Sequence, residues 1–341
     1  MRDVRGLLLV LVCVFLSACH EEVLIDPALL PSSERGALTQ GRYFVAGGGT
    51  IDEVVRQEDG TATLGRVHEE AGCVFSGLTA HRQYLYGACT TFVPVPVPGG
   101  PPTLFPVGAV LVRVDLDRPE GDARRVMRAP LRGPSLFPNG MATDARGRIY
   151  IANSYSFVAG AFGQPASAAL LRVDVNDEAA FTIAQSDLLS ATEGFPVPNG
   201  VQIEGSTLYL SSLNRLYRGT LTRAGALQGL TVVHEADPSS AFDDFAVLPG
   251  HKILLTELTN PFPAVAQLVY PGVSFPEEPL SRLALVELRG SGSKLLHEHR
   301  FTGGVRPSSV TVVPEGHDAP PALYVTDYFR GGVHRLSLGR P

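Results

Sequence analysis

The chain has 341 residues, with 36 glycines and 27 prolines, and its formal net charge is −6. Only Lys252 and Lys294 are lysines, and the sequence shows no basic patch, which argues against a nucleic-acid partner. Short strand-like stretches bounded by glycine and proline dominate, and sustained amphipathic helical patterns are scarce. We therefore expect an all-β protein that is long enough to bury a large core.

The first 18 residues have the features of an export leader. A basic start precedes an apolar run, residues 7–16, which is too short to span a bilayer. The run ends in Leu-Ser-Ala-Cys19, which resembles the lipobox of bacterial lipoproteins, where the cysteine carries the lipid. The alternatives are an ordinary signal peptide with a chance cysteine, or a buried helix. We expect residues 1–18 to be removed and Cys19 to anchor the protein in the cell envelope. The next residue is His20 and not an aspartate, which favours the outer membrane.

The residues after Cys19 include two prolines and two adjacent serines, a composition typical of a flexible tether. We expect this tether to cover residues 19–33. A single folded domain is then expected over residues 34–341.

Two cysteines remain for the folded domain, Cys73 and Cys89. They lie at equal distances from a predicted hairpin turn near His81, so antiparallel pairing would place them side by side. An exported compartment permits a disulfide, and closing a loop of this size stabilises the fold by about 3 kcal/mol. Two buried free thiols are the alternative, whereas two cysteines alone cannot form a structural zinc site.

One hairpin pattern recurs along the chain. It is clearest at residues 137–154, where Pro-Asn-Gly leads into a short strand, a tight turn and a second strand. A third apolar strand and a weaker fourth strand follow most of these hairpins, and four antiparallel strands per repeat form the blade of a β-propeller. Five blades are clear, and residues 35–69 supply a sixth. The prediction is a six-bladed β-propeller, with seven blades as the alternative. The last blade has no obvious fourth strand, and an N-terminal segment could complete it.

Two segments carry a specific resemblance. PNGMATDARGRIYIAN at residues 138–153 and PNGVQIEGSTLYLSS at residues 198–212 resemble the senescence marker protein, gluconolactonase and luciferin-regenerating enzyme family. The pattern extends over residues 35–338, but the sharp motifs are these two hairpins and the hairpin at Asp243. The resemblance implies a six-bladed propeller and a metal-dependent lactone or ester hydrolase, although fold alone does not determine function.

The residues that open the innermost strands should converge on one mouth of the central channel. This ring would contain two amides and a carboxylate, and oxygen donors of this kind suit Ca²⁺, Mg²⁺ or Mn²⁺. The resemblance implies that Asn199 and Asp243 bind the metal, with Ca²⁺ as the expected ion, and that Asn139 lies beside the metal or the substrate. The alternative is that these residues serve only turn chemistry. The remaining ring positions are Arg35, Ser76 and Ser308.

The first blade departs from the family pattern. The family has a metal-binding glutamate directly before Gly-Pro, where this chain has Glu34-Arg35-Gly36-Ala37. A shift of one residue on a strand reverses the direction of a side chain. A local bulge could restore Glu34 as a metal ligand, or Arg35 could take the place of the metal. Glu257, which ends a second strand near the same mouth, is a third possibility.

Three long connections, residues 90–108, 155–168 and 260–280, are expected between second and third strands, on the face where the ring opens. They are rich in proline or aromatic residues and could line an apolar pocket. The alternative is that they are lineage-specific insertions without a function.

Two functional hypotheses follow. The first is a metal-dependent lactone or ester hydrolase, in which the metal polarises a carbonyl and Asp243 or Asp244 takes a proton from water. Asn139 is the second candidate catalytic residue. The other hypothesis is a non-catalytic envelope protein whose propeller binds a protein or a glycan. The chain contains no Gly-x-Ser-x-Gly elbow and no phosphate-binding loop. Membrane contact is expected only through the lipid.

Overall fold

The computed structural model describes residues 20–96, 103–133, 136–154, 168–190, 197–259, 281–290, 292–301, 304–315, 321–327 and 330–337. The expected leader and Cys19 lie outside these ranges. Within them, the regular structure is β-strand, and no helix is long and apolar enough to cross a membrane.

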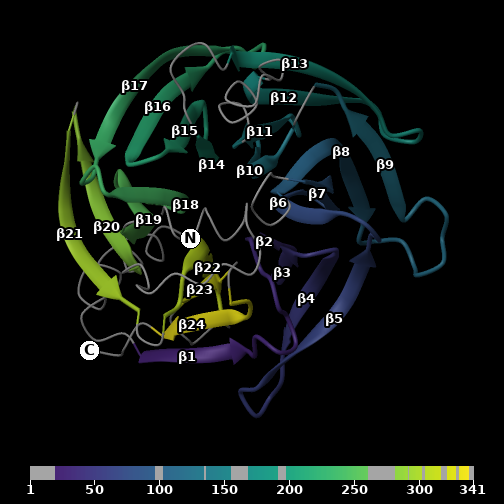
Figure 1. Cartoon of the computed structure of the whole chain (residues 1–341), viewed down its shortest axis with the longest axis horizontal. Helices are drawn as coiled ribbons and strands as arrows, with labels where there is room; N and C mark the ends of the chain where they lie inside the picture. Colours follow the sequence, from purple (N-terminus) through teal and green to yellow (C-terminus); the bar gives the residue numbers. More distant parts are fainter. Residues whose placement is uncertain are drawn as a thin grey trace.

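Six four-stranded antiparallel sheets surround a central axis, which confirms the predicted six-bladed β-propeller and excludes seven blades (Figure 1). The strands of the first three blades are β2 (Arg35–Thr39), β3 (Arg42–Gly47), β4 (Thr50–Arg56), β5 (Ala62–Glu69); β6 (Val74–His81), β7 (Tyr84–Val95), β8 (Thr103–Asp115), β9 (Val126–Leu131); and β10 (Pro138–Thr143), β11 (Ile149–Asn153), β12 (Ala168–Asp177), β13 (Thr182–Ser190). Those of the last three are β14 (Pro198–Glu204), β15 (Thr207–Ser212), β16 (Arg215–Leu221), β17 (Leu227–Glu235); β18 (Ser240–Leu248), β19 (Lys252–Thr259), β20 (Ser281–Arg289), β21 (Gly292–Arg300); and β22 (Pro307–Val313), β23 (Ala322–Asp327), β24 (Val333–Ser337) with β1 (His20–Ile25).

The sixth blade contains strands from both ends of the described chain. Strand β1 pairs antiparallel with β24, and its register joins His20 to Ser337 and Ile25 to Val333. The predicted closure by an N-terminal segment is therefore confirmed, but the prediction of a tether over residues 19–33 is wrong for this part. The reason is the apolar run within the segment, because Leu24 and Ile25 are buried in the core. The prolines and serines follow the strand and lead into the first blade.

The core consists of separate apolar layers between neighbouring blades. Each of the six buried clusters draws its side chains from two adjacent blades, for example from blades one and two around Phe44 and Phe75. Near the channel mouth, hydroxyl groups also link the blades. The hydroxyl of Ser154 donates to the carbonyl of Pro198 at 2.8 Å, and that of Ser211 donates to the carbonyl of Asp243 at 3.0 Å. These contacts hold the starts of the inner strands in one ring.

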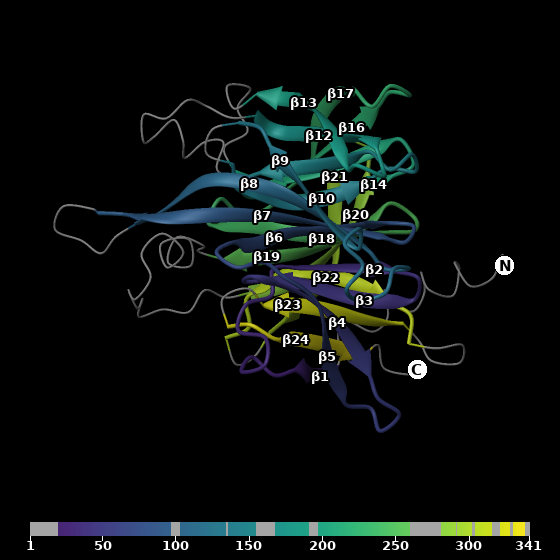
Figure 2. The same cartoon turned by 90° about the vertical axis from the view of Figure 1, so that its right-hand side faces the viewer.

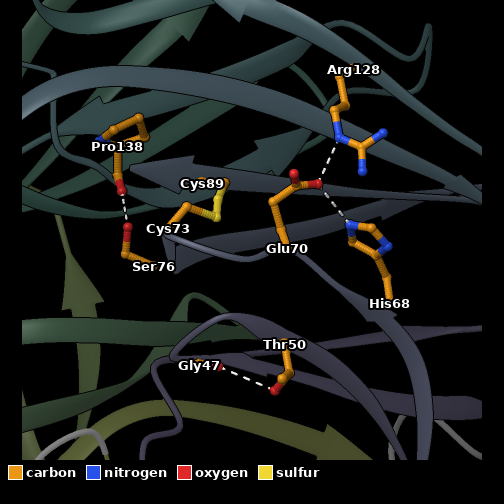
Figure 3. Close-up of a disulfide and its surroundings, with 9 residues drawn as sticks. All are labelled: Gly47, Thr50, His68, Glu70, Cys73, Ser76, Cys89, Arg128 and Pro138. Atoms are coloured by element: carbon orange, nitrogen blue, oxygen red, sulfur yellow. Dashed lines mark hydrogen bonds and ion pairs between the residues drawn. A yellow bond between two sulfur atoms is a disulfide. The ribbon is translucent and has the colours of Figure 1, made fainter. Parts of the chain in front are cut away.

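The structure joins Cys73 and Cys89 in a disulfide whose Cα atoms are 5.7 Å apart (Figure 3). The bond connects the residue before β6 to the middle of β7, at the edge where the hydroxyl of Ser76 donates to the carbonyl of Pro138 in the next blade. The disulfide thus ties the inner hairpin of the second blade close to the channel mouth.

The connection predicted at residues 90–108 is largely an extension of the sheet. Strands β7 and β8 continue as a paired ribbon to Val95 and Thr103, and they project from one side of the disc (Figure 2). The other two predicted connections, at residues 155–168 and 260–280, fall almost wholly outside the described residues.

Candidate functional site

Local irregularities at the starts of the inner strands bring the predicted residues to the channel mouth. The strand register shifts between Pro138 and Met141 in β10, and between Pro198 and Val201 in β14. Each shift leaves an Asn-Gly pair opposite a single residue of the neighbouring strand, which is the geometry of a β-bulge. Glycine is required here because a Cβ on Gly140 would lie 2.2 Å from the carbonyl oxygen of Asn199 in the next blade.

The bulge in β18 presents two consecutive carboxylates. Its register shifts between Phe242 and Phe245, so that Asp243 and Asp244 together oppose Thr256. In a regular strand, consecutive side chains point to opposite faces, and one of the two would be directed away from the channel. With the bulge, Asp243 stays partly exposed at the mouth, while Asp244 is buried and lies 2.5 Å from Arg35.

The structure brings the four predicted metal and catalytic residues into one polar cluster. Asn139 is hydrogen-bonded to the carboxylate of Glu34, and Asn199 is hydrogen-bonded to that of Asp243. Glu34 also lies close enough to Asp243 for the two charges to repel each other. The cluster therefore contains two carboxylates and two amides, contributed by blades one, three, four and five.

Both Glu34 and Arg35 reach the axis. The two alternatives that the sequence left open, a glutamate ligand or an arginine cation at the axis, therefore do not exclude each other. Strand β2 pairs regularly from Arg35 onward, whereas Glu34 precedes it. The backbone N–H of Glu34 donates to the carbonyl of Ala46, and its carbonyl accepts from the hydroxyl of Thr326 in the sixth blade. Because Glu34 lies outside the ladder, strand alternation does not set its direction. Arg35 points deeper into the channel, where Nη1 contacts Asp244 and Nη2 donates to the carbonyls of Met141 at 3.2 Å and Val201 at 3.3 Å.

The carboxyl groups of Glu34, Asp243 and Asp244 have strongly perturbed acidities. Burial, reinforced by the negative charge of Asp243, raises the pKa of Glu34 well above its usual value. Burial and the nearby Asp244 raise the pKa of Asp243 to about 8. Burial also raises the pKa of Asp244, to about 6, and the guanidinium of Arg35 limits that rise. Groups that resist ionisation in this way are typical of sites that hold protons or a cation.

The donor set fits a hard divalent cation. Glu34, Asp243 and Asp244 carry three negative charges when ionised, and Arg35 supplies one positive charge, which leaves two negative charges to be balanced. The Oδ1 atom of Asn199 is buried without a hydrogen-bond partner, as an unused ligand atom would be. Among the described residues, no group of three or more His, Cys, Asp or Glu side chains could hold an ion. A cation would therefore need the amide oxygens as well as carboxylates, and an all-oxygen set of this kind suits hard cations in general.

The other ring candidates have different partners. Glu257 is paired through both oxygens with Arg282, at 2.9 Å for each contact, so it is not the missing ligand of the first blade. The hydroxyls of Ser76 and Ser308 lie against the backbone carbonyls of Pro138 and Ser33, and both serve the contacts between blades.

A cavity of about 390 Å³ lies in the channel beyond Arg35. Its walls come from the middle and end of the inner strands, with Leu38, Leu78 and Val310 among the apolar residues and Gln202 and Thr311 among the polar ones. Arg35 lines this cavity and also pairs with Asp244 beside the ring, so the guanidinium separates the two parts of the channel. We did not predict from the sequence that Arg35 divides the channel into two parts. A charged residue at the start of a predicted inner strand was the signal that could have indicated it.

Comparison with known proteins supports the fold. No protein-family profile matches the sequence, and no curated protein matches it. Among solved structures, a gluconolactonase from Xanthomonas campestris is 17% identical with a TM-score of 0.57, covering 96% of this chain and 92% of its own. The soluble aldose sugar dehydrogenase from Escherichia coli is 12% identical with a TM-score of 0.56, covering 94% and 100%. A chain from a nidogen–laminin complex is 14% identical with a TM-score of 0.51, covering 87% and 89%. At these identities the similarity shows the six-bladed fold and leaves the activity open.

Proposed function

We propose that the protein is a metal-dependent hydrolase of lactones or esters, with sugar lactones as the first substrate class to test. The observation that carries this proposal is the cluster of Glu34, Asn139, Asn199 and Asp243 at the channel mouth, whose unbalanced charge matches one divalent cation. The similarity in fold to a gluconolactonase supports the choice of lactones. Ca²⁺ is the expected ion because all the available donors are oxygens.

In this proposal Glu34, Asn199 and Asp243 hold the cation, which when bound would polarise the substrate carbonyl. Asn139 contacts Glu34 and orients the substrate from the edge of the cluster. Asp243 accepts the proton of the attacking water, because it is partly exposed whereas Asp244 is buried against Arg35. Water adds to the carbonyl carbon, the ring C–O bond breaks, and the accepted proton returns to the departing alkoxide. The products are a hydroxy acid from a lactone, or an acid and an alcohol from an ester.

The proposal also places the protein at the bacterial cell envelope. The lipobox-like sequence that ends at Cys19 supports a lipid anchor, and His20 in the following position supports the outer membrane. The anchor can be tested independently of the activity, because Cys19→Ser should release the protein from the membrane fraction. Recovery of that variant with membranes would exclude lipidation as the means of attachment.

The activity is tested by calorimetric titration of the metal-depleted protein with Ca²⁺, Mg²⁺, Mn²⁺ and Zn²⁺, followed by assays on lactones and esters. Wild type should bind one divalent ion per chain and open a lactone only with that ion present. Asp243→Ala should lose both properties, whereas Asp187→Ala, which removes an exposed carboxylate from β13, should keep both. Lactone hydrolysis that persists in Asp243→Ala would exclude this site.

A second candidate function is binding of an envelope protein or glycan without catalysis. The similarity in fold to a chain of the nidogen–laminin complex favours it, since that structure is one of a protein complex. In this case no ion changes the melting temperature of the wild type, and no lactone or ester is opened. Such a result would mean that the guanidinium of Arg35 takes the place of a metal ion. Pull-down from envelope extracts with Asp243→Ala as the bait would then retain the same partner as wild type.

A further inference from the structure

The strand that closes the propeller begins directly after the candidate lipid-bearing residue. Strand β1 starts at His20, and it is paired from that residue with Ser337 of β24. A flexible tether of 14 residues would have an end-to-end distance of about 20 Å. Here no such spacer separates Cys19 from the folded ring, because the chain is already part of a blade at the next residue.

The strand is held firmly along its length. Leu24, Ile25 and Leu30 are buried between the sixth and first blades, and Glu22 forms an ion pair of 2.9 Å with Arg335. Releasing β1 to serve as a spacer would expose these side chains and break the closure of the ring, at about 1.5–3 kcal/mol for each large apolar side chain. The N-terminal end of the folded domain is thus a rigid point of attachment.

The direction of the strands decides which face carries this point. In the sixth blade β22 starts at the ring mouth and runs away from it, β23 returns, and β24 runs away again to Ser337. His20 pairs with Ser337, so it lies on the face opposite the cluster of Glu34 and Asp243. The same face carries the turn between β4 and β5, while the ribbon of β7 and β8 projects from the ring face (Figure 2).

We propose that the lipid on Cys19 holds the propeller against the bilayer with the face opposite the ring turned to the lipid. The channel mouth and the ribbon of β7 and β8 then face away from the membrane. This inference rests on the lipid anchor of the proposed function and is independent of the hydrolase activity. The surface of the bilayer therefore covers the face opposite the ring. Cys19 directly precedes His20, which lies on that face, so no spacer separates the lipid from the domain.

The absence of tryptophan from the whole chain allows a direct test of this orientation. Glu58→Trp places a single tryptophan in the exposed turn before β5, and Ala71→Trp places one at the exposed position just after β5. The eight residues of β5 separate these reporters by about 26 Å across the thickness of the disc. Both lie in the first blade, whose strand β5 contacts β1, so the two reporters differ mainly in which face of the disc they occupy.

Each variant is purified in its lipidated form and reconstituted into vesicles that contain brominated phosphatidylcholine, a fluorescence quencher. The fluorescence of Glu58→Trp should be strongly reduced relative to vesicles without bromine, and that of Ala71→Trp should not change. A Gly/Ser linker of 12 residues inserted between Cys19 and His20 should abolish the quenching of Glu58→Trp while membrane binding persists.

Equal quenching of the two reporters, stronger quenching of Ala71→Trp, or quenching that survives the linker would each overturn the orientation. Mass spectrometry of the purified protein checks the premise, and a mature chain without lipid would overturn both the anchor and this inference. The metal and lactone assays would still decide the hydrolase, because they do not depend on the membrane.

Discussion

Arg35 is the residue whose removal tests the electrostatics of the channel most directly. Its side chain is 4% exposed and that of its partner Asp244 is 5% exposed, with 2.5 Å between Nη1 and Oδ1. The same guanidinium donates to two backbone carbonyls, in the third and fourth blades. Arg35→Met keeps most of the side-chain volume but leaves Asp244 without its cation. Breaking one partner of a buried pair destabilises a protein by about 3–5 kcal/mol.

The size of this loss should depend on pH. At pH 8 Asp244 is ionised in the wild type, because its pKa is about 6. In Arg35→Met the same carboxylate must either stay charged without a partner or take up a proton, and both cost free energy at this pH. At pH 5 Asp244 is already largely protonated in the wild type, so less ion-pair energy is lost. We therefore expect a larger destabilisation at pH 8 than at pH 5.

Equilibrium urea unfolding followed by far-ultraviolet circular dichroism measures the effect. With a slope of about 3 kcal/mol per molar urea, the loss corresponds to a midpoint lowered by about 1–2 M at pH 8. The double variant Arg35→Met/Asp244→Leu should recover most of the midpoint, because apolar replacement of a buried pair is often neutral. Arg215→Met, which breaks an exposed pair with Glu235, is the control and should cost less than about 1 kcal/mol. A midpoint for Arg35→Met within 0.3 M (roughly 1 kcal/mol) of the control at pH 8 would refute the reasoning.

Three further predictions concern other parts of the ring. Reducing the bond between Cys73 and Cys89, 16 residues apart, should lower the unfolding free energy by about 3 kcal/mol, and alkylation without reductant should modify neither thiol in the oxidised protein. Without metal, the free energy of unfolding should fall as pH rises from 4 to 8, because the folded state keeps a proton on Asp243, whose pKa is about 8 against an ordinary 3.8; urea midpoints measured across this range test the direction, and Asp243→Asn should make the fall less steep, with Glu34 and Asp244 contributing the remainder. Deleting residues 20–25 should lower the melting temperature and promote aggregation, because it uncovers β24 and the buried partners of Leu24; a deletion variant that melts like its parent would contradict this role of β1.

The architecture could be predicted from the amino-acid sequence alone, because the signal for each blade is local and is repeated along the chain. Each hairpin combines alternating apolar residues with a tight turn, and five repeats of this signal require a ring of equivalent blades. The equivalence of the blades also predicts that Asn139, Asn199 and Asp243 lie together at one mouth of the channel. The disulfide followed from the same local reasoning, since hairpin pairing brings Cys73 close to Cys89.

The way in which the first blade meets the axis could not be predicted from local sequence. Strand alternation predicts one direction for Glu34 and the other for Arg35, yet both reach the channel because the ladder of β2 starts between them. Likewise, two neighbouring carboxylates can share the channel only through the bulge in β18, which depends on pairing with β19. The composition of residues 19–33 suggested a tether, but the free edge of β24 recruits His20–Ile25 as a strand. In each case, pairing between segments distant in the sequence overrides the preference of the local residues, because an unpaired edge or an uncompensated buried charge costs more than a local irregularity.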